Sequence, residues 1–122
     1  MITAASEDGY QRAADGVERK TLVHGERTLM VRFRLAAGSG LPPHSHPHEQ
    51  TGYLVSGRAR FTVGGDTTGS DTVGGDTAGG ETTEVGPGDS WCIPGGVEHS
   101  LVVLEDSVAV EVFSPVREAY LP

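Results

Sequence analysis

The sequence predicts an all-β fold, an antiparallel sandwich or barrel, on two observations. Eighteen glycines and seven prolines among 122 residues interrupt most windows in which a helix would have to form. Elsewhere the apolar residues recur at every second position, which is the spacing of a half-buried strand, whereas a helix needs a period of about 3.6 residues. A chain of this length is about one domain, so we expect a single domain over residues 1–122.

Alternation of apolar and polar residues marks the individual strands. Leu29, Val31, Phe33 and Leu35 give the clearest of these patterns. Ser56 and Gly57 are expected to turn the chain from the second strand into the third. The stretches that we expect to be strands are 29–35, 53–55, 59–63, 99–103 and 108–112.

Residues 64–83 form a low-complexity insertion of four five-residue copies, the first of which is Gly-Gly-Asp-Thr-Thr. Almost nothing in the insertion can be buried, so we expect a solvated, mobile hairpin tip between two paired strands, 61–63 and 84–85. Calcium binding is the alternative, because each copy carries an acid. Calcium-binding glycine-rich repeats, however, recur about every nine residues and include buried apolar positions.

Charge and composition exclude several classes of function. Seventeen acidic against nine basic residues give a net charge of -8, which repels nucleic-acid phosphates and anionic lipid heads. We expect neither partner. No apolar run approaches a membrane span, and the first ten residues are acidic, so a cytoplasmic location is predicted. The single cysteine, Cys92, fits a reducing compartment, and its neighbours Trp91 and Ile93 suggest that it is buried.

The histidines are the candidate metal ligands. His44 and His46 are two residues apart in a proline-rich segment, and side chains two apart in an extended chain point the same way. His99 follows from a later strand. A single histidine is more often a hydrogen-bonded surface or core residue than a ligand. Whether these three are metal ligands therefore has to be judged from the spacing of the residues around them.

That spacing resembles two motifs of the cupin family. The residues that match in order are Gly38, His44, His46, Gln50, Gly57, Gly88, Pro94, Gly96 and His99. The resemblance implies a jelly-roll β-barrel that binds one divalent metal ion through His44, His46, Gln50 and His99. The ligand types allow zinc, nickel, iron(II), cobalt or manganese. Members of the family are often homodimers, and Val17–Val23 is a candidate intersubunit strand.

Two positions depart from the family pattern. Gln50 stands where many cupins have Glu, and Val103 stands where the second motif usually has Asn. Adjacent residues in a strand face opposite ways, so we expect Gln50 to reach the metal through its carbonyl oxygen and Glu49 to face outward. Four neutral ligands leave the full charge on the ion, which favours Lewis-acid chemistry over oxygen activation.

Three stretches, 44–50, 93–99 and 111–118, are similar to the KdgF-like cupins of pectin and alginate catabolism. This resemblance implies an enzyme that converts 4,5-unsaturated monouronates, small anionic sugars, into linear keto acids. It also implies catalytic roles for Glu111, Phe113 and Arg117, with Glu111 replacing the Asp that is usual there. Glu111 and Phe113 share the face of Ala109, which we expect to line the interior.

Each of these assignments has an alternative. Glu111 is otherwise an exposed edge residue, Phe113 a core residue and Arg117 a surface residue. The alternative functions are a metal-dependent dioxygenase, a non-catalytic metal- or sugar-binding module, and a structural barrel whose histidines bind adventitious metal.

Overall fold

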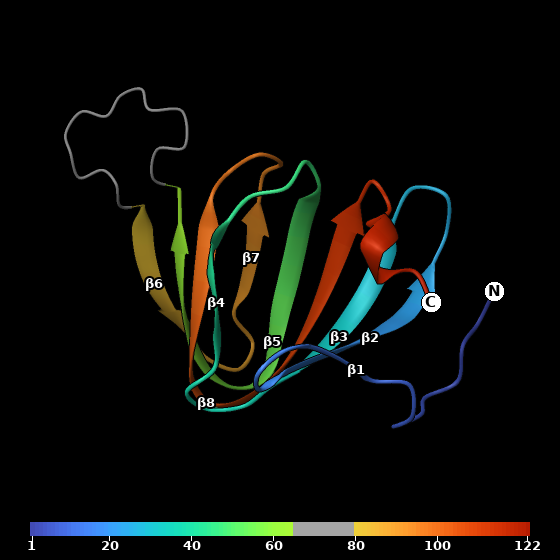
Figure 1. Ribbon diagram of the computed structural model, residues 1–122, viewed down its shortest axis with the longest axis horizontal. Helices are drawn as coiled ribbons and strands as arrows, with labels where there is room; N and C mark the ends of the chain where they lie inside the picture. The colour runs from blue at the N-terminus through green and yellow to red at the C-terminus, as the bar shows by residue number, and fades with distance from the viewer. Residues whose placement is uncertain (65–79) are drawn as a thin grey trace.

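The computed structural model describes residues 1–64 and 80–122, and nearly all of its regular structure is strand (Figure 1). The all-β prediction is therefore confirmed. The described elements are β1 (Gln11–Ala14), β2 (Val17–His24), β3 (Leu29–Leu35), β4 (Gly40–His44), β5 (Glu49–Val63), β6 (Glu81–Val85), β7 (Ser90–Ile93), β8 (His99–Ser114) and a short 3-10 helix, η2 (Glu118–Tyr120). No helix in the described ranges is long and apolar enough to cross a membrane.

Two long antiparallel strands, β5 and β8, organise the fold. The strand order is β1-β2-β3-β8-β5-β6, with β4 also pairing with β8 and β7 also pairing with β5. The shorter strands use different halves of the long ones: β7 pairs with the first half of β5 and β6 with the second. Likewise β4 pairs with the first half of β8 and β3 with the second. The long strands thus pass through both layers of a jelly roll.

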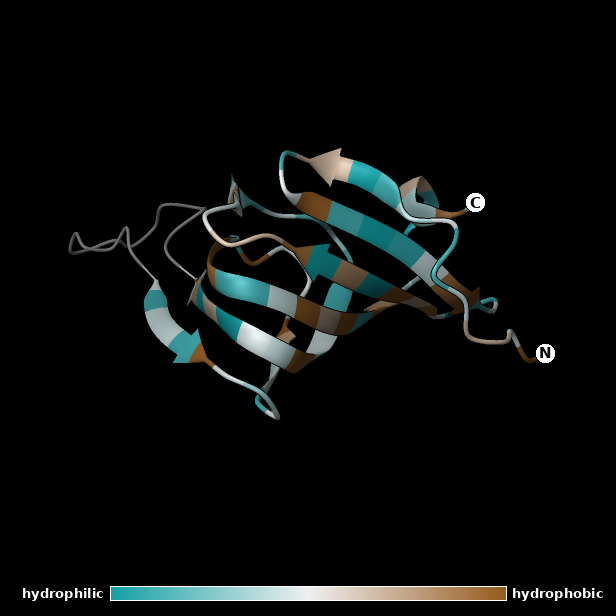
Figure 2. Cartoon of the chain, turned by 90° about the horizontal axis from the view of Figure 1, so that it is seen from below, coloured by the Kyte–Doolittle hydropathy of each residue, from teal (hydrophilic) through white to brown (hydrophobic). Residues whose placement is uncertain are grey.

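The core lies between these layers and follows the predicted alternation in β3, whereas in β5 the apolar residues Tyr53 and Val55 that predicted the strand face outward. In β3 every second residue from Leu29 to Leu35 is buried and the residues between them are partly exposed. Figure 2 shows the same alternation as brown and teal bands along the strands. In β5 the inward residue is Leu54, 1% exposed, whereas Tyr53 and Val55 face outward and are about half exposed.

The predicted turn at Ser56 and Gly57 is wrong, because β5 runs through it as one strand. The pairing of β5 with β8 shifts register on both sides of Ser56 and again after Arg58. Gly57 has a φ of +96°, and a Cβ there would collide with Ser107. This irregularity switches the inward positions from the parity of Leu54 to that of Phe61, as a β-bulge does.

The two predicted strands 99–103 and 108–112 are likewise one strand, β8. Its exposed middle, Glu105 and Asp106, breaks the apolar pattern but not the backbone pairing, since Arg58 still pairs with Glu105. Val17–Val23 lies in β2, which pairs with β1 and β3 of its own chain. The pairing with β1 covers only Val17–Arg19, so the use of this stretch as an intersubunit strand stays a prediction. The homodimer stays a prediction.

Two further expectations concern short segments. Cys92 is exposed, not buried, because the inward positions of β7 belong to its neighbours Trp91 and Ile93. The strands that flank the insertion pair as expected, with Val63 opposite Glu81. Residues 81–83, which were assigned to the insertion, are strand residues of β6. The expected hairpin tip between them lies outside the described residues.

Candidate metal centre and adjoining pocket

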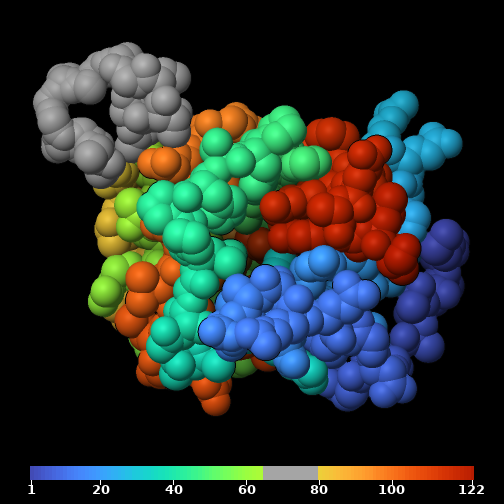
Figure 3. All heavy atoms as spheres, viewed as in Figure 1, coloured from blue at the N-terminus to red at the C-terminus, as the bar shows by residue number. Residues whose placement is uncertain are grey.

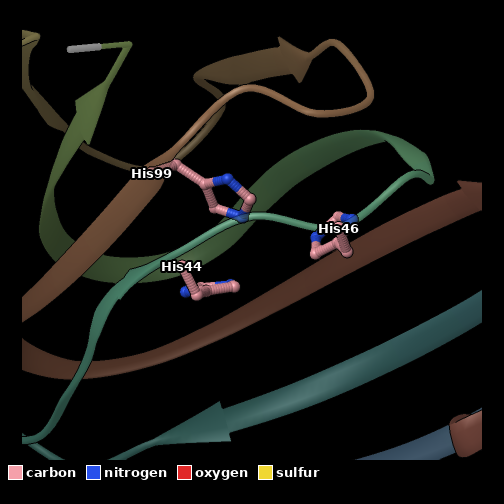
Figure 4. A group of neighbouring side chains, drawn as sticks. All are labelled: His44, His46 and His99. Atoms are coloured by element: carbon pink, nitrogen blue, oxygen red, sulfur yellow. The ribbon is translucent and has the colours of Figure 1, made fainter. Parts of the chain in front are cut away.

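Three histidines from two parts of the chain, residues 44–46 and residue 99, lie close together (Figure 4). His44 ends β4, His46 follows it in the connection to β5, and His99 begins β8. The β4–β8 pairing places His44 opposite His99. One ring nitrogen from each histidine lies within 4.8 Å of the others, so the three side chains are grouped closely enough that they could hold one metal ion.

Hydrogen bonds to the backbone orient all three rings. The Nδ1 atom of His44 lies 2.8 Å from a carbonyl oxygen, that of His46 lies 3.1 Å from one, and that of His99 lies 2.9 Å from one. A carbonyl oxygen only accepts, so each Nδ1 carries the proton and each Nε2 keeps its lone pair. Nε2 of His99 is buried and finds no hydrogen-bond partner among the residues that the structure describes.

Gln50 adds an oxygen to this group of nitrogens. It is 4% exposed, and its Oε1 lies 2.8 Å from Nε2 of His46. The Gln50 Nε2 donates to Oε2 of Glu111 at 2.7 Å, which turns Oε1 toward the histidines. Two atoms that can only accept hydrogen bonds therefore face each other at close range. Two ligands that share an ion at about 2.1 Å lie roughly 3 Å apart, so this donor set fits a divalent cation.

The predicted opposite orientations of two neighbouring residues are confirmed, because Gln50 is buried and Glu49 is exposed. His48 lies beside the cluster, with its ring centroid 5.4 Å from that of His46, but it is not one of the three converging histidines.

Glu111 is buried on the inner face of β8, which excludes the exposed-edge alternative. It is 7% exposed and shares that face with Ala109 and Phe113, as expected. Its Oε2 accepts hydrogen bonds from Gln50 and, at 2.8 Å, from Nε1 of Trp91. Burial raises the pKa of Glu111, and these two donors and the charge of Arg117 only partly oppose the rise.

A pocket adjoins the histidines and contains all three residues with predicted catalytic roles. The described residues that line it include His44, Gln50, His99, Trp91, Glu111, Phe113, Arg117 and Tyr120. Phe113 is 1% exposed, so most of its surface packs in the core. In Figure 3 the red C-terminal segment lies beside the green segment that contains the start of β5.

Arg117 is held over two aromatic rings. Its Cζ lies 5.2 Å from the ring centroid of Phe113 and 4.3 Å from that of Tyr120. The η2 turn that carries Tyr120 is fastened to β2, because the Thr21 hydroxyl and the Arg19 guanidinium donate to backbone oxygens of that turn. None of the ion pairs in the described part of the chain uses Arg117, so its charge is available to a ligand.

The histidine pKa values lead to a pH prediction for the metal-free protein. Burial first, and then the charges of Arg117 and His99, lower the pKa of His46 from 6.5 to about 4; burial also lowers that of His99. Protons therefore bind the unfolded chain more tightly, and the Tm should fall as the pH drops from about 6.5 toward about 4. Glu111 contributes a pH dependence of stability in the opposite direction, because its raised pKa favours folding at low pH.

Variants separate this histidine effect from other acid effects. Thermal melts between pH 7.5 and 4 should show a shallower fall of Tm for His46→Asn than for the wild type. His24→Asn, which changes a histidine outside the cluster, should follow the wild-type curve. Parallel curves for His46→Asn and the wild type would contradict the assignment.

Comparisons with known proteins agree with this fold and site. A family model described as the cupin domain matches residues 31–70. The pectin degradation protein KdgF of Dickeya dadantii (strain 3937) is 26% identical over 94% of this chain and 93% of its own length. The structure of KdgF from Halomonas sp. superposes with a TM-score of 0.82, at 28% identity, over 99% of this chain and 98% of that one.

A second kind of relative is larger than this chain. Oxalate decarboxylase OxdC of Bacillus subtilis (strain 168) is 31% identical over 80% of this chain, which corresponds to 22% of OxdC. Fold, converging histidines and matches together define a cupin. KdgF matches over nearly the full length of both chains, and these matches support a KdgF-like cupin.

Proposed function

We propose that the chain is a metal-dependent enzyme of pectin and alginate breakdown, which converts 4,5-unsaturated monouronates into linear keto acids. The likeness to KdgF supports the pathway. The observation that carries the proposal is the position of Gln50, whose Oε1 faces His46 of the histidine cluster while its Nε2 donates to the buried carboxyl group of Glu111, in a pocket that also contains Arg117.

The metal-binding residues in this proposal are His44, His46, His99 and Gln50. When bound, a divalent ion supplies Lewis-acid polarisation of a substrate oxygen. The four ligands are neutral, and the orphaned Nε2 of His99 supports this set. A carboxylate ligand would cancel part of the charge on the ion.

Arg117 binds the substrate carboxylate in this scheme. A guanidinium pairs with a carboxylate through two parallel hydrogen bonds, and the aromatic rings beneath it limit its motion. The net charge of the protein, -8, repels an anionic sugar at a distance. Attraction must therefore be local to Arg117 and the metal centre.

Glu111 moves the proton. Both donors, Gln50 and Trp91, bind Oε2, which leaves Oε1 to exchange a proton with the substrate. Ring opening breaks the bond between C1 and the ring oxygen as the C1 hydroxyl loses its proton and becomes an aldehyde. The electron pair of the broken bond stays on the ring oxygen, which becomes an enolate at C5, and the enolate becomes a ketone when C4 gains the proton. The substrate is isomerised with no other reactant, and Glu111 carries the proton between the two sites.

Loss of the conjugated alkene absorbance tests the proposal. Metal-loaded wild type should remove the absorbance of an unsaturated monouronate, and chelation followed by dialysis should abolish this activity until metal is restored. A metal-loaded preparation that leaves the absorbance unchanged would contradict the proposed reaction. Oxygen uptake in the same cuvette would instead indicate the dioxygenase alternative.

Substitution of Arg117 should weaken substrate binding more than turnover. We expect Arg117→Gln to raise KM about 10- to 100-fold, because glutamine can keep one of the two hydrogen bonds and the other, to a charged group, contributes about 1.5–3 kcal/mol. Metal content should be unchanged. Arg60→Gln, at an exposed position of β5, is the matched control. An unchanged KM for Arg117→Gln would place the substrate carboxylate elsewhere.

A further inference from the structure

We propose that Trp91 is a positioning residue for Glu111. The absence of a side chain at Gly52, on the intervening strand, is what allows the indole of Trp91 to reach the Glu111 carboxyl group. The catalytic part of this inference rests on the proposed function. The structural part is that the indole determines which carboxylate oxygen of Glu111 accepts its hydrogen bond, and this part does not depend on the proposed function.

The three residues form one row across the sheet. Trp91 on β7 pairs with Gly52 on β5, and Gly52 pairs on its other side with Glu111 on β8. Neighbouring strands are about 4.8 Å apart, so two strand spacings, about 10 Å, separate the backbones of Trp91 and Glu111. Direct contact over that span needs a long side chain and an open path. The Trp91 Nε1 nevertheless donates to Oε2 of Glu111 at 2.8 Å.

Gly52 provides the open path. The three heavy atoms nearest to a Cβ built at this glycine all belong to the Trp91 indole, and all three are closer than any real Cβ contact. The backbone of Gly52 is not in the left-handed region, so its conformation does not demand glycine. The indole itself therefore explains the missing side chain, as expected of a glycine within a strand where another group approaches closely.

The contact determines the orientation of the carboxyl group. Trp91 on β7 and Gln50 on β5 both donate to Oε2, so rotation of the group would break two hydrogen bonds at a buried site. Oε1 is left for proton transfer. The Phe61 ring, whose centroid is 4.6 Å from that of Trp91, packs on the indole and limits its motion.

The single tryptophan of the chain allows a sharp test. Growth with 3-benzothienylalanine in place of tryptophan replaces only Trp91, keeps the shape of the ring and exchanges the N–H for sulfur. We expect kcat to fall about 10- to 100-fold, with KM within about twofold, because a small displacement of a catalytic group is costly. Metal content should stay the same. Trp91→Phe should give a similar loss of kcat.

Gly52→Ala should reproduce that loss by displacing the indole. Gly25→Ala is its matched control, because a Cβ there meets no atom within 4 Å and the backbone is not left-handed. A kcat within about twofold of wild type for both the benzothienyl protein and Gly52→Ala would overturn the catalytic role, since a displacement that matters costs more.

An NMR measurement tests the contact without turnover. The protein has one indole N–H signal, which should exchange slowly with water and should shift in Glu111→Gln and in Gly52→Ala. A rapidly exchanging signal that neither substitution moves would overturn the contact itself. If wild type is inactive on unsaturated uronates, the proposed function fails, while the indole signal still decides whether Trp91 holds Glu111.

Discussion

Glu111→Gln is expected to lower kcat by about 10²- to 10⁴-fold, the usual contribution of a positioned acid-base group. Glutamine has nearly the same shape, and its side-chain oxygen can still accept the hydrogen bonds of Gln50 and Trp91. It cannot accept or release a proton at neutral pH. The loss should therefore fall on kcat, with metal content and Tm close to those of the wild type.

The matched control for this substitution is Glu49→Gln. Glu49 is exposed on the outer face of β5, although it adjoins the buried Gln50 in sequence. Its variant should keep wild-type kcat in the alkene absorbance assay. A Glu111→Gln protein that is folded, metal-loaded and as active as Glu49→Gln would remove Glu111 from the chemistry and leave it a structural role.

The strand content was predictable from sequence because inward and outward positions alternate wherever a strand is regular. The first strand, 29–35, matches β3 in its bounds and in its buried residues. The predictions failed where the alternation itself changes. At Gly57 a bulge reverses which residues face the core. In the sequence alone, the resulting break in the apolar alternation looks the same as a turn between two strands. At Glu105 and Asp106 the strand continues through solvent-facing residues, which carry no apolar signal.

The candidate ligands were predictable for a local reason. The direction of a side chain in an extended segment follows from residue parity, which brought His44 and His46 together and separated Gln50 from Glu49. The fit of the four to one ion needed the fold, because His99 meets His44 only through the β4–β8 register. Their metal-binding role stays a prediction.

The other pocket residues were not found from sequence. Trp91 reaches Glu111 only because β7, β5 and β8 are in one particular register. Tyr120 lies in the pocket because η2 folds back onto β2. The one sequence signal for Trp91 was Gly52, because a glycine inside a strand indicates a close approach by another group. Nothing local indicated Tyr120.

Substitution of His99 is expected to have the largest effect on metal binding. Its Nε2 is buried and has no hydrogen-bond partner in the described ranges, while its Nδ1 is held by the backbone, so the ring is already oriented for a ligand role. His99→Ala removes one of four donors. The affinity should fall by more than the roughly 10- to 100-fold that results from changing a residue hydrogen-bonded to a ligand.

Two measurements check this expectation. Metal analysis after dialysis should find about one ion per chain in the wild type and little in His99→Ala, and titration should give the affinities. Because a bound ion stabilises the folded state, added metal should also raise the Tm of the wild type and not that of the variant.

His24→Ala is the control, since His24 lies at the end of β2, outside the cluster. It should bind metal like the wild type and show the same rise of Tm. If His99→Ala retained the wild-type affinity, the three histidines would not share an ion, and the proposed metal-dependent reaction would lose the site on which it depends.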